Sequence, residues 1–149
     1  MNLAEYEKMY RLEERYWWFV ARRRLALNLA RGVLDAPPGT RLLDLGCGTG
    51  VLLKEATDFH GTGADFSPTA LEFCRTRGLA RLALADGQAL PFADGSFDVV
   101  VALDVFEHIP DDRAAFAEAA RVLRPGGILV LSVPAFRWLW GPHDVALHH

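Results

Sequence analysis

A glycine-rich string between two segments of regular structure constrains the fold of this chain more than any other feature. Residues 41–45 form a short apolar run with an acid at Asp44, and residues 51–56 suit a helix. Between them stand three glycines at alternate positions, Gly46, Gly48 and Gly50. A strand that enters a glycine-rich turn and continues into a helix is typical of the nucleotide site of an open α/β sheet, because glycine permits a tight turn and the helix start offers N–H groups.

The spacing of the glycines distinguishes two classes of ligand. A dinucleotide fingerprint needs a further glycine at the sixth position counted from Gly46, where this chain has Val51. Asp44 adds a carboxylate that could hold a cationic group and would repel a pyrophosphate. An NAD(P)-binding oxidoreductase domain therefore remains an alternative that the string disfavours.

Composition indicates one ordinary globular domain. The chain has 149 residues, of which 51% are hydrophobic and 23% charged. Its net charge of −3 gives no general attraction to nucleic acid, and we expect no nucleic-acid partner. Without a long apolar run or a signal-peptide layout, we expect a cytoplasmic protein with no stable membrane association. Two cysteines are too few for a disulfide framework.

Residues 1–38 are expected to form an N-terminal helical extension. Residues 3–34 have helical composition, and Pro37-Pro38-Gly39 ends it. An aromatic cluster at 16–19 precedes a basic one at 22–24. One interpretation packs the aromatic side chains onto a sheet and leaves the arginines in water. The other makes the extension a lid, with Tyr16, Trp17 or Trp18 over the ligand and an arginine against a ligand carboxylate. Contact with a membrane surface or with RNA is a third interpretation, which the short basic run disfavours.

Further strands and helices alternate along the rest of the chain. We expect strands at 60–65, 79–85, 97–103 and 128–133, and helices at 68–77 and 113–123. The second helix is expected to bury a stripe of four residues: Phe116, Ala119, Ala120 and Leu123. This alternation predicts a doubly wound α/β domain whose parallel sheet has the order 3-2-1-4-5. Asp65 lies about 20 residues beyond Gly46, the distance at which an acid accepts from ribose hydroxyls, although it could also cap a helix or be solvated.

Several of these segments together resemble a known enzyme family. The string Asp44-x-Gly-x-Gly-x-Gly is similar to the first motif of class I S-adenosylmethionine-dependent methyltransferases, and the resemblance extends over residues 40–134. Asp65, Asp86, the segment 104–108 and Leu-Arg-Pro-Gly-Gly before the last strand fit it. The start Tyr-Trp-Trp-Phe-x-x-Arg-Arg resembles the "type 11" small-molecule methyltransferases. The resemblance implies a Rossmann-like fold and direct methyl transfer to a small-molecule acceptor, with O-methylation favoured and S-adenosylhomocysteine as product.

The same resemblance implies which residues hold the cofactor. Asp65 would bind ribose, Asp86 would accept from the adenine amino group, and Leu103 would approach the methionine end through its backbone. The full set of expected cofactor-binding residues is Asp44, Gly46, Cys47, Gly48, Gly50, Asp65, Phe66, Asp86, Gly87, Gln88, Leu103 and Trp17.

Asp104, Glu107 and His108 are candidates for the chemistry. At positions i, i+3 and i+4 they would share one helical face. They resemble the acidic-x-x-Glu-His pattern of ubiquinone-biosynthesis-type O-methyltransferases, which implies a divalent ion, and oxygen-rich ligands suit Mg²⁺. His108 could instead be the base that takes a proton from a substrate hydroxyl, or the segment could bond only to protein. The chain lacks the Asn/Asp-Pro-Pro-aromatic motif of enzymes that methylate base amines, which disfavours a nucleobase acceptor.

Residues 135–149 are expected to form an irregular tail on the substrate side. The resembling fold has seven strands, and only five are recognised here, so the chain would be a fragment or a natural short form. In either case its fifth strand would present an open edge, on which a homodimer could form. A non-catalytic S-adenosylmethionine-binding or interaction module is the alternative function for such a form.

Overall fold

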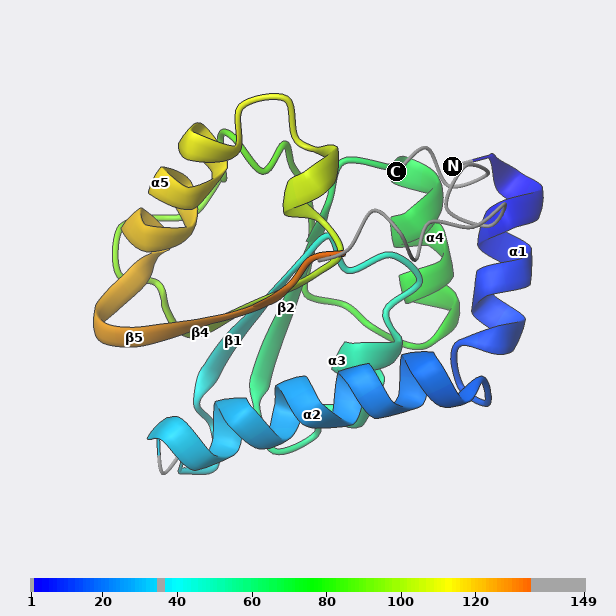
Figure 1. Ribbon diagram of the computed structural model, residues 1–149, viewed down its shortest axis with the longest axis horizontal. Helices are drawn as coiled ribbons and strands as arrows, with labels where there is room; N and C mark the ends of the chain where they lie inside the picture. Colours follow the sequence, from blue (N-terminus) through cyan, green and yellow to red (C-terminus); the bar gives the residue numbers. More distant parts are fainter. Residues whose placement is uncertain (1, 35–36, 135–149) are drawn as a thin grey trace.

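Five parallel strands form one sheet with the order β3-β2-β1-β4-β5, as predicted (Figure 1). The computed structural model describes residues 2–34 and 37–134. The strands are β1 (Arg41–Leu45), β2 (His60–Asp65), β3 (Leu82–Leu84), β4 (Phe97–Leu103) and β5 (Leu123–Ser132). The helices are α1 (Leu3–Leu12), α2 (Trp17–Leu34), α3 (Val51–Glu55), α4 (Pro68–Thr76) and α5 (Asp112–Val122), with a 3₁₀ turn η1 (Phe106–His108). The α/β class and the N-terminal helices are therefore confirmed.

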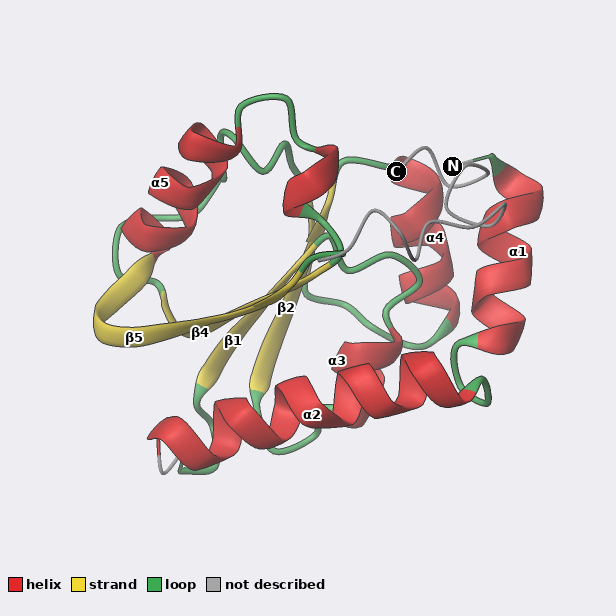
Figure 2. Ribbon diagram, in the orientation of Figure 1, coloured by secondary structure: helices red, strands yellow, loops and turns green. Residues whose placement is uncertain are grey.

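Helices cover both faces of the sheet, as Figure 2 shows. Successive side chains of a strand point to opposite faces, so each central strand supplies two cores. Leu42, Val99 and Val101 pack with residues of α2, α3 and α4. Leu43 and Val100 pack on the other face with α5 and η1. All five strand residues are fully buried, which explains why β1 and β4 have near-continuous apolar sequences.

The strand boundaries differ from the prediction at both edges of the described sheet. β3 covers only 82–84 instead of 79–85, and its side chains are half-buried or exposed because it pairs only with β2. β5 begins at Leu123 and so includes the turn residues that were expected to precede it. No strand lies beyond β5 among the described residues; the homodimer through this edge stays a prediction, and the tail 135–149 lies outside the described residues.

The predicted buried stripe of α5 was correct at Ala119 and wrong at its other positions, where the buried residues lie one position earlier in the sequence. The buried residues of α5 are Ala115, Ala119 and Val122. Phe116 is 42% exposed and its ring stacks on that of Phe106, with centroids 4.3 Å apart. Small side chains bring α5 close to the sheet, while the bulky ring stays at the helix margin.

The N-terminal extension is two helices rather than one. α1 ends at Leu12, α2 begins at Trp17, and the chain turns sharply between them. α2 lies along one face of the sheet and α1 packs beside α4, where Tyr10 and Phe73 have ring centroids 5.2 Å apart (Figure 1). No helix within 2–34 or 37–134 is both long and apolar enough to cross a bilayer.

Candidate functional site

The glycine-rich turn uses its N–H groups inside the protein. The three glycines have left-handed φ angles of 69°, 53° and 84°: Gly46, Gly48 and Gly50. The N–H groups of Gly46 and Cys47 both donate to the carbonyl of Ala64, at 2.8 and 3.1 Å. That of Gly48 donates to the Asp65 carboxylate at 2.9 Å, and that of Gly50 to the carbonyl of Cys47 at 2.9 Å. These four donors are therefore engaged by the protein and do not form a phosphate cradle.

Asp65 lies at the end of β2 and joins the turn to the start of α4. Its second carboxylate oxygen accepts from the N–H of Ser67 at 2.9 Å, and Ser67 caps α4. The residue is only 6% exposed. Burial raises the pKa of Asp65, while the hydrogen bonds from Ser67 and Gly48 oppose the rise. The helix-start role and the expected ribose role are compatible, because each oxygen keeps a lone pair for a further donor.

Asp44 lies on the same face of the sheet as Asp65. It pairs in register with Gly63, two residues before Asp65, so both side chains point toward the α2 side. Burial raises the pKa of Asp44 well above its usual value, and the negative charges of Asp65 and Glu13 add to the rise. The carboxyl ends of β1 and β2 thus place two buried acids on one face of the sheet.

Arg22 brings a positive charge close to Asp44. Its side chain is 18% exposed, forms an ion pair with Asp104, and lies in the electrostatic range of Asp44 and Glu107. The Nε atom is buried without a hydrogen-bond partner. Burial lowers the pKa of Arg22, although Glu107 and Asp44 oppose the shift. A donor left unsatisfied at the carboxyl end of the sheet could meet an acceptor on a ligand.

The segment after β4 does not form the expected helical face. Asp104 has a left-handed φ of 55° and lies outside η1, which contains only three residues, so the i, i+3, i+4 alignment was wrong. One carboxylate oxygen of Asp104 accepts from the hydroxyl of Ser132 at 2.7 Å, and the other pairs with Arg22. Glu107 and His108 are exposed on the turn beyond.

No magnesium site is formed in this region. Among residues 2–34 and 37–134, no three carboxylate, imidazole or thiol groups gather in a way that could hold a metal ion. The expectation that Asp104, Glu107 and His108 hold Mg²⁺ is therefore not supported. The backbone conformation of Asp104 prevents such a metal site, because it directs the carboxylate to Arg22 and Ser132.

The predicted adenine residues lie in the loop after β3. Asp86 is exposed, and its carboxylate accepts from the backbone N–H of Gln88 at 2.9 Å and from the side-chain amide at 3.0 Å. These hydrogen bonds lower the pKa of Asp86. A Cβ at Gly87 would lie 2.8 Å from Cδ1 of Ile109, so a side chain there would require the end of Ile109 to shift. Phe66 is 73% exposed directly after β2.

Two further predicted residues differ in their burial. Cys47 is 8% exposed, and its sulfur lies 3.8 Å from that of Cys74; the hydrogen bond with Cys74 and burial raise the pKa of the Cys47 thiol. Leu103, the last residue of β4, is half-buried. Trp17 is 67% exposed at the start of α2, where its ring contacts Tyr16 and Trp18. The roles proposed for these residues stay predictions.

The first interpretation of the N-terminal clusters was wrong for most of their residues, although Arg24 is exposed as it expected and Phe19 is half-buried. Tyr16, Trp17 and Trp18 are each at least 50% exposed and do not pack onto the sheet. Arg22 and Arg23 are instead withdrawn from water, since Arg23 is 3% exposed and forms two hydrogen bonds with Glu55, at 2.8 and 2.6 Å. Ion pairing allows arginines to be buried where isolated charges would not be.

The sequence did not single out α1, yet this helix lies over the turn. Tyr6 is 4% exposed, and burial and the nearby Asp65 raise its pKa. The methyl group of Met9 would lie 3.1 Å from a Cβ at Gly48. A surface depression of about 540 Å³ lies at the opposite end of the sheet, around Arg41, His60 and Arg81, and contains none of the acids. The candidate site is therefore the acid-lined carboxyl end of β1, β2 and β4, beneath α1.

Comparison with known proteins identifies the family. Residues 43–131 match the family model described as "Methyltransferase domain", which covers more than half of the chain. The chain belongs to this methyltransferase family. The match includes the glycine-rich turn and the two buried acids, and it excludes the oxidoreductase alternative as a family assignment.

Curated relatives of this methyltransferase domain differ in their acceptors. The 2-methyl-6-phytyl-1,4-hydroquinone methyltransferase of Synechocystis is 42% identical over 109 residues, 68% of this chain and 34% of that protein. The 27-O-demethylrifamycin SV methyltransferase of Amycolatopsis mediterranei is 41% identical over 118 residues, which are 72% of this chain and 43% of that protein. Proteins named "Probable tRNA methyltransferase 9B" from mouse, cattle and human are 37% identical over 66% of this chain and 22–23% of theirs.

A solved structure extends the similarity to the N-terminal helices. The protein in complex with the Haloferax volcanii Trm112 methyltransferase activator has a TM-score of 0.77 and 26% sequence identity, over 97% of this chain and 63% of that chain. The methyltransferase domain described here spans less than half the length of the curated relatives it matches.

The buried Asp44 of this methyltransferase domain should make stability depend on pH. Because its pKa is raised in the folded state, the stability it contributes is present at low pH and is lost as pH rises through the raised value. Asp44→Asn removes this loss, so the variant should gain on the wild type by up to about 1.4 kcal/mol per pH unit within the titration range. Thermal unfolding of the ligand-free wild type and of Asp44→Asn from pH 4 to 9 measures this difference in stability. If stability depends on pH in the same way in both proteins, the pKa of Asp44 is not raised.

Proposed function

We propose that this domain binds S-adenosylmethionine and transfers its methyl group to a hydroxyl group of a small-molecule acceptor. The observation that supports this most is the charge of the site. Asp44 and Asp65 are buried beside a glycine-rich turn whose N–H groups at four positions are engaged by the protein. Such a site disfavours phosphate and favours a cation, and the sulfonium and ammonium groups of S-adenosylmethionine are cations.

Each part of the cofactor has a candidate partner at the carboxyl end of the sheet. Asp65 would accept from the ribose hydroxyls with its remaining lone pairs, and Asp86 from the adenine amino group. The buried Nε of Arg22 would donate to the cofactor's carboxylate, while Asp44 would hold the ammonium group. Trp17 would close the site from α2, and the backbone of Leu103 would lie at the methionine end.

The methyl group is transferred by direct displacement, so the protein chiefly aligns acceptor oxygen, methyl carbon and sulfur and excludes water. Positioning of this kind can supply about 7–11 kcal/mol of the barrier. His108 is exposed at the carboxyl end of β4 and would take the proton of the acceptor hydroxyl. An acceptor of modest size and no strong negative charge suits a chain with a net charge of −3 better than RNA does.

Ligand-induced thermal shifts test the cofactor assignment. We expect S-adenosylmethionine and S-adenosylhomocysteine to raise the melting temperature of the protein, since ligands that bind only the folded state stabilise it, and NAD to have no effect. Transfer of a radiolabelled methyl group to a panel of phenols, hydroquinones, macrolide alcohols and tRNA then identifies the acceptor class. A shift with NAD alone would contradict the proposal, and a cofactor shift without transfer to any acceptor would favour the non-catalytic binding module.

His108→Gln separates the base from the cofactor site. We expect an unchanged S-adenosylhomocysteine shift and a decrease in kcat of about 10²–10⁴-fold on an alcohol acceptor, the usual contribution of general base catalysis. With a phenol of low pKa as the acceptor, kcat should decrease less, because the phenol is already partly ionised. Equal losses on both acceptors would contradict a base at this position.

A further inference from the structure

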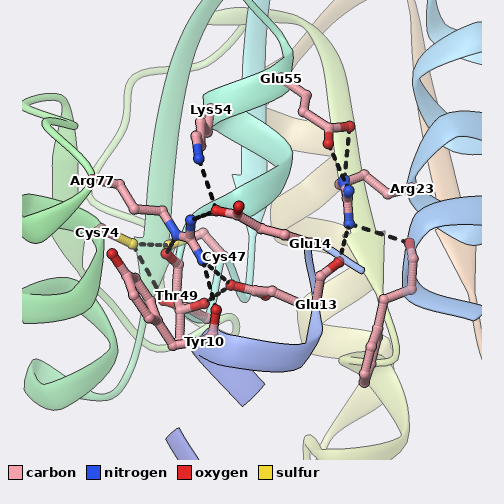
Figure 3. A network of polar contacts seen from close by, with 12 residues as sticks. Tyr10, Glu13, Glu14, Arg23, Cys47, Thr49, Lys54, Glu55, Cys74 and Arg77 are labelled. Carbon is pink, nitrogen blue, oxygen red and sulfur yellow. Dashed lines mark hydrogen bonds and ion pairs between the residues drawn. The ribbon is translucent and has the colours of Figure 1, made fainter. Parts of the chain in front are cut away.

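Three side chains from separate parts of the chain meet beside the glycine-rich turn. Glu13 directly follows α1, Thr49 lies within the turn, and Arg77 follows α4. Figure 3 shows them at the centre of one polar network. The side chains of Glu13 and Arg77 are 7% and 2% exposed, and Thr49 is fully buried. Buried polar groups of this kind are retained only when they are well partnered.

The network holds Thr49 by both its main chain and its side chain. One carboxylate oxygen of Glu13 accepts from the Thr49 hydroxyl and, at 2.6 Å, from Nη2 of Arg77. Nε of Arg77 donates to the Thr49 carbonyl at 2.8 Å. Because Thr49 stands between Gly48 and Gly50, these contacts hold the middle of the turn in place.

The same arginine holds the turn between the two N-terminal helices. Arg77 lies 4.0 Å from the ring centroid of Tyr10, donates to the Tyr10 carbonyl at 3.3 Å and pairs with Glu14. Arg23 of α2 donates to the Glu13 carbonyl at 2.9 Å. Residues at the end of α1 are thus attached to the core through Arg77 and to α2 through Arg23 (Figure 3).

α1 covers the groups that the cofactor must reach. Met9 lies against Gly48, and Tyr6 is buried near Ser67 and Asp65. α1 therefore lies over the carboxylate that the ribose is proposed to contact. The contacts at Glu13 attach the carboxyl end of α1 to the rest of the protein.

We propose that α1 is a cap over the cofactor site and that Glu13, Thr49 and Arg77 form the latch that holds it in place. They are positioning residues: closure of the cap brings the Glu13 carboxylate onto Thr49 and Arg77, and this sets the turn that receives the cofactor. The inference depends on the proposed function, since it assigns the latch to S-adenosylmethionine. Loss of the latch would leave buried charged groups less well partnered and would loosen both the cap and the turn that receives the cofactor.

Thr49→Val and Thr49→Ser test the latch as a matched pair. Valine has the shape of threonine without the hydroxyl, and serine keeps the hydroxyl. We expect Thr49→Val to weaken binding of S-adenosylhomocysteine by about tenfold in isothermal titration, and Thr49→Ser to restore most of it. Hydrogen exchange gives a second readout: in the ligand-free protein the amides of residues 3–12 should exchange faster in Thr49→Val than in the wild type, and S-adenosylhomocysteine should slow them in the wild type.

Arg31→Met is the control, because it removes an exposed ion pair that is remote from the turn. The side chains of Arg31 and Asp58 in this pair are 38% and 44% exposed. We expect wild-type affinity and wild-type exchange in α1. The latch is refuted, and the proposed function stands, if the wild type binds S-adenosylhomocysteine and Thr49→Val has the same affinity and the same hydrogen exchange in α1. If the wild type does not bind S-adenosylhomocysteine, the proposed function fails, and the latch fails with it.

Discussion

Replacing Asp65 with alanine is expected to abolish the thermal shift produced by S-adenosylhomocysteine. The carboxylate supports the turn through the N–H of Gly48 and the start of α4 through the N–H of Ser67, and it is the proposed ribose acceptor. Alanine removes all three interactions at once. Two backbone donors left unpaired in a buried position should also lower the free energy of unfolding of the ligand-free protein by about 1–3 kcal/mol or more.

Asp111→Ala provides the matched control for Asp65→Ala. Asp111 accepts from the N–H of Ala114 at 3.0 Å at the exposed start of α5, so it is also an acid that supports a helix. Its loss should cost about 1 kcal/mol, as for other N-cap residues, and leave the ligand shift intact. Calorimetric or fluorescence melting with and without S-adenosylhomocysteine measures both effects. A retained shift in Asp65→Ala would mean that the ribose lies elsewhere.

Gly46→Ala is expected to lower the free energy of unfolding by about 3 kcal/mol. Two effects add here. Gly46 has a φ of 69°, which costs a residue with a side chain about 1–2 kcal/mol. A Cβ at this position would also lie 2.4 Å from Cγ2 of Val105, and overpacking of this kind costs about 1–3 kcal/mol.

Gly78→Ala separates the two effects. Gly78 has a similar φ of 81°, but nothing lies within 4 Å of the position of its Cβ. This variant should therefore show only the conformational cost. The double variant Gly46→Ala/Val105→Ala should recover part of the steric cost. Urea unfolding measures all three, and equal losses in Gly46→Ala and Gly78→Ala would show that Val105 moves aside at little cost.

Much of the fold could be predicted from the sequence because local patterns and topology agree in this chain. The alternation of apolar strands with helices permits few sheet orders, and the observed order β3-β2-β1-β4-β5 is the predicted one. The glycine-rich turn and the two acids Asp44 and Asp65 follow from their places at strand ends, where parallel strands bring their carboxyl ends to one edge.

The break between α1 and α2 could not be predicted in this way. Residues 13–15 are Glu, Glu and Arg, all good helix formers, and no glycine or proline marks the turn. The turn forms because Glu13 and Glu14 pair with Arg77, 64 and 63 residues away in the sequence. A tertiary contact overrides the local preference, and a pattern read along one segment contains no sign of it.

The prediction for the segment after β4 was wrong for a related reason. The spacing of Asp104, Glu107 and His108 suits a helix, but the left-handed backbone of Asp104 precedes a single 3₁₀ turn. Arg22 and Ser132 hold the Asp104 carboxylate, and both come from distant segments. Residue spacing predicts a shared face only where the helix itself is present.

The pairing of Glu13 with Arg77 also orders events during synthesis. The nascent chain presents the N-terminal helices first, yet their docking partner emerges 64 residues later, about 3–13 s at translation rates of roughly 5–20 residues per second. During that interval the carboxylates of Glu13 and Glu14 have no Arg77 with which to pair. Docking of the N-terminal helices therefore waits for Arg77 at the end of α4, so the first segment to leave the ribosome cannot take its final place until that residue has emerged.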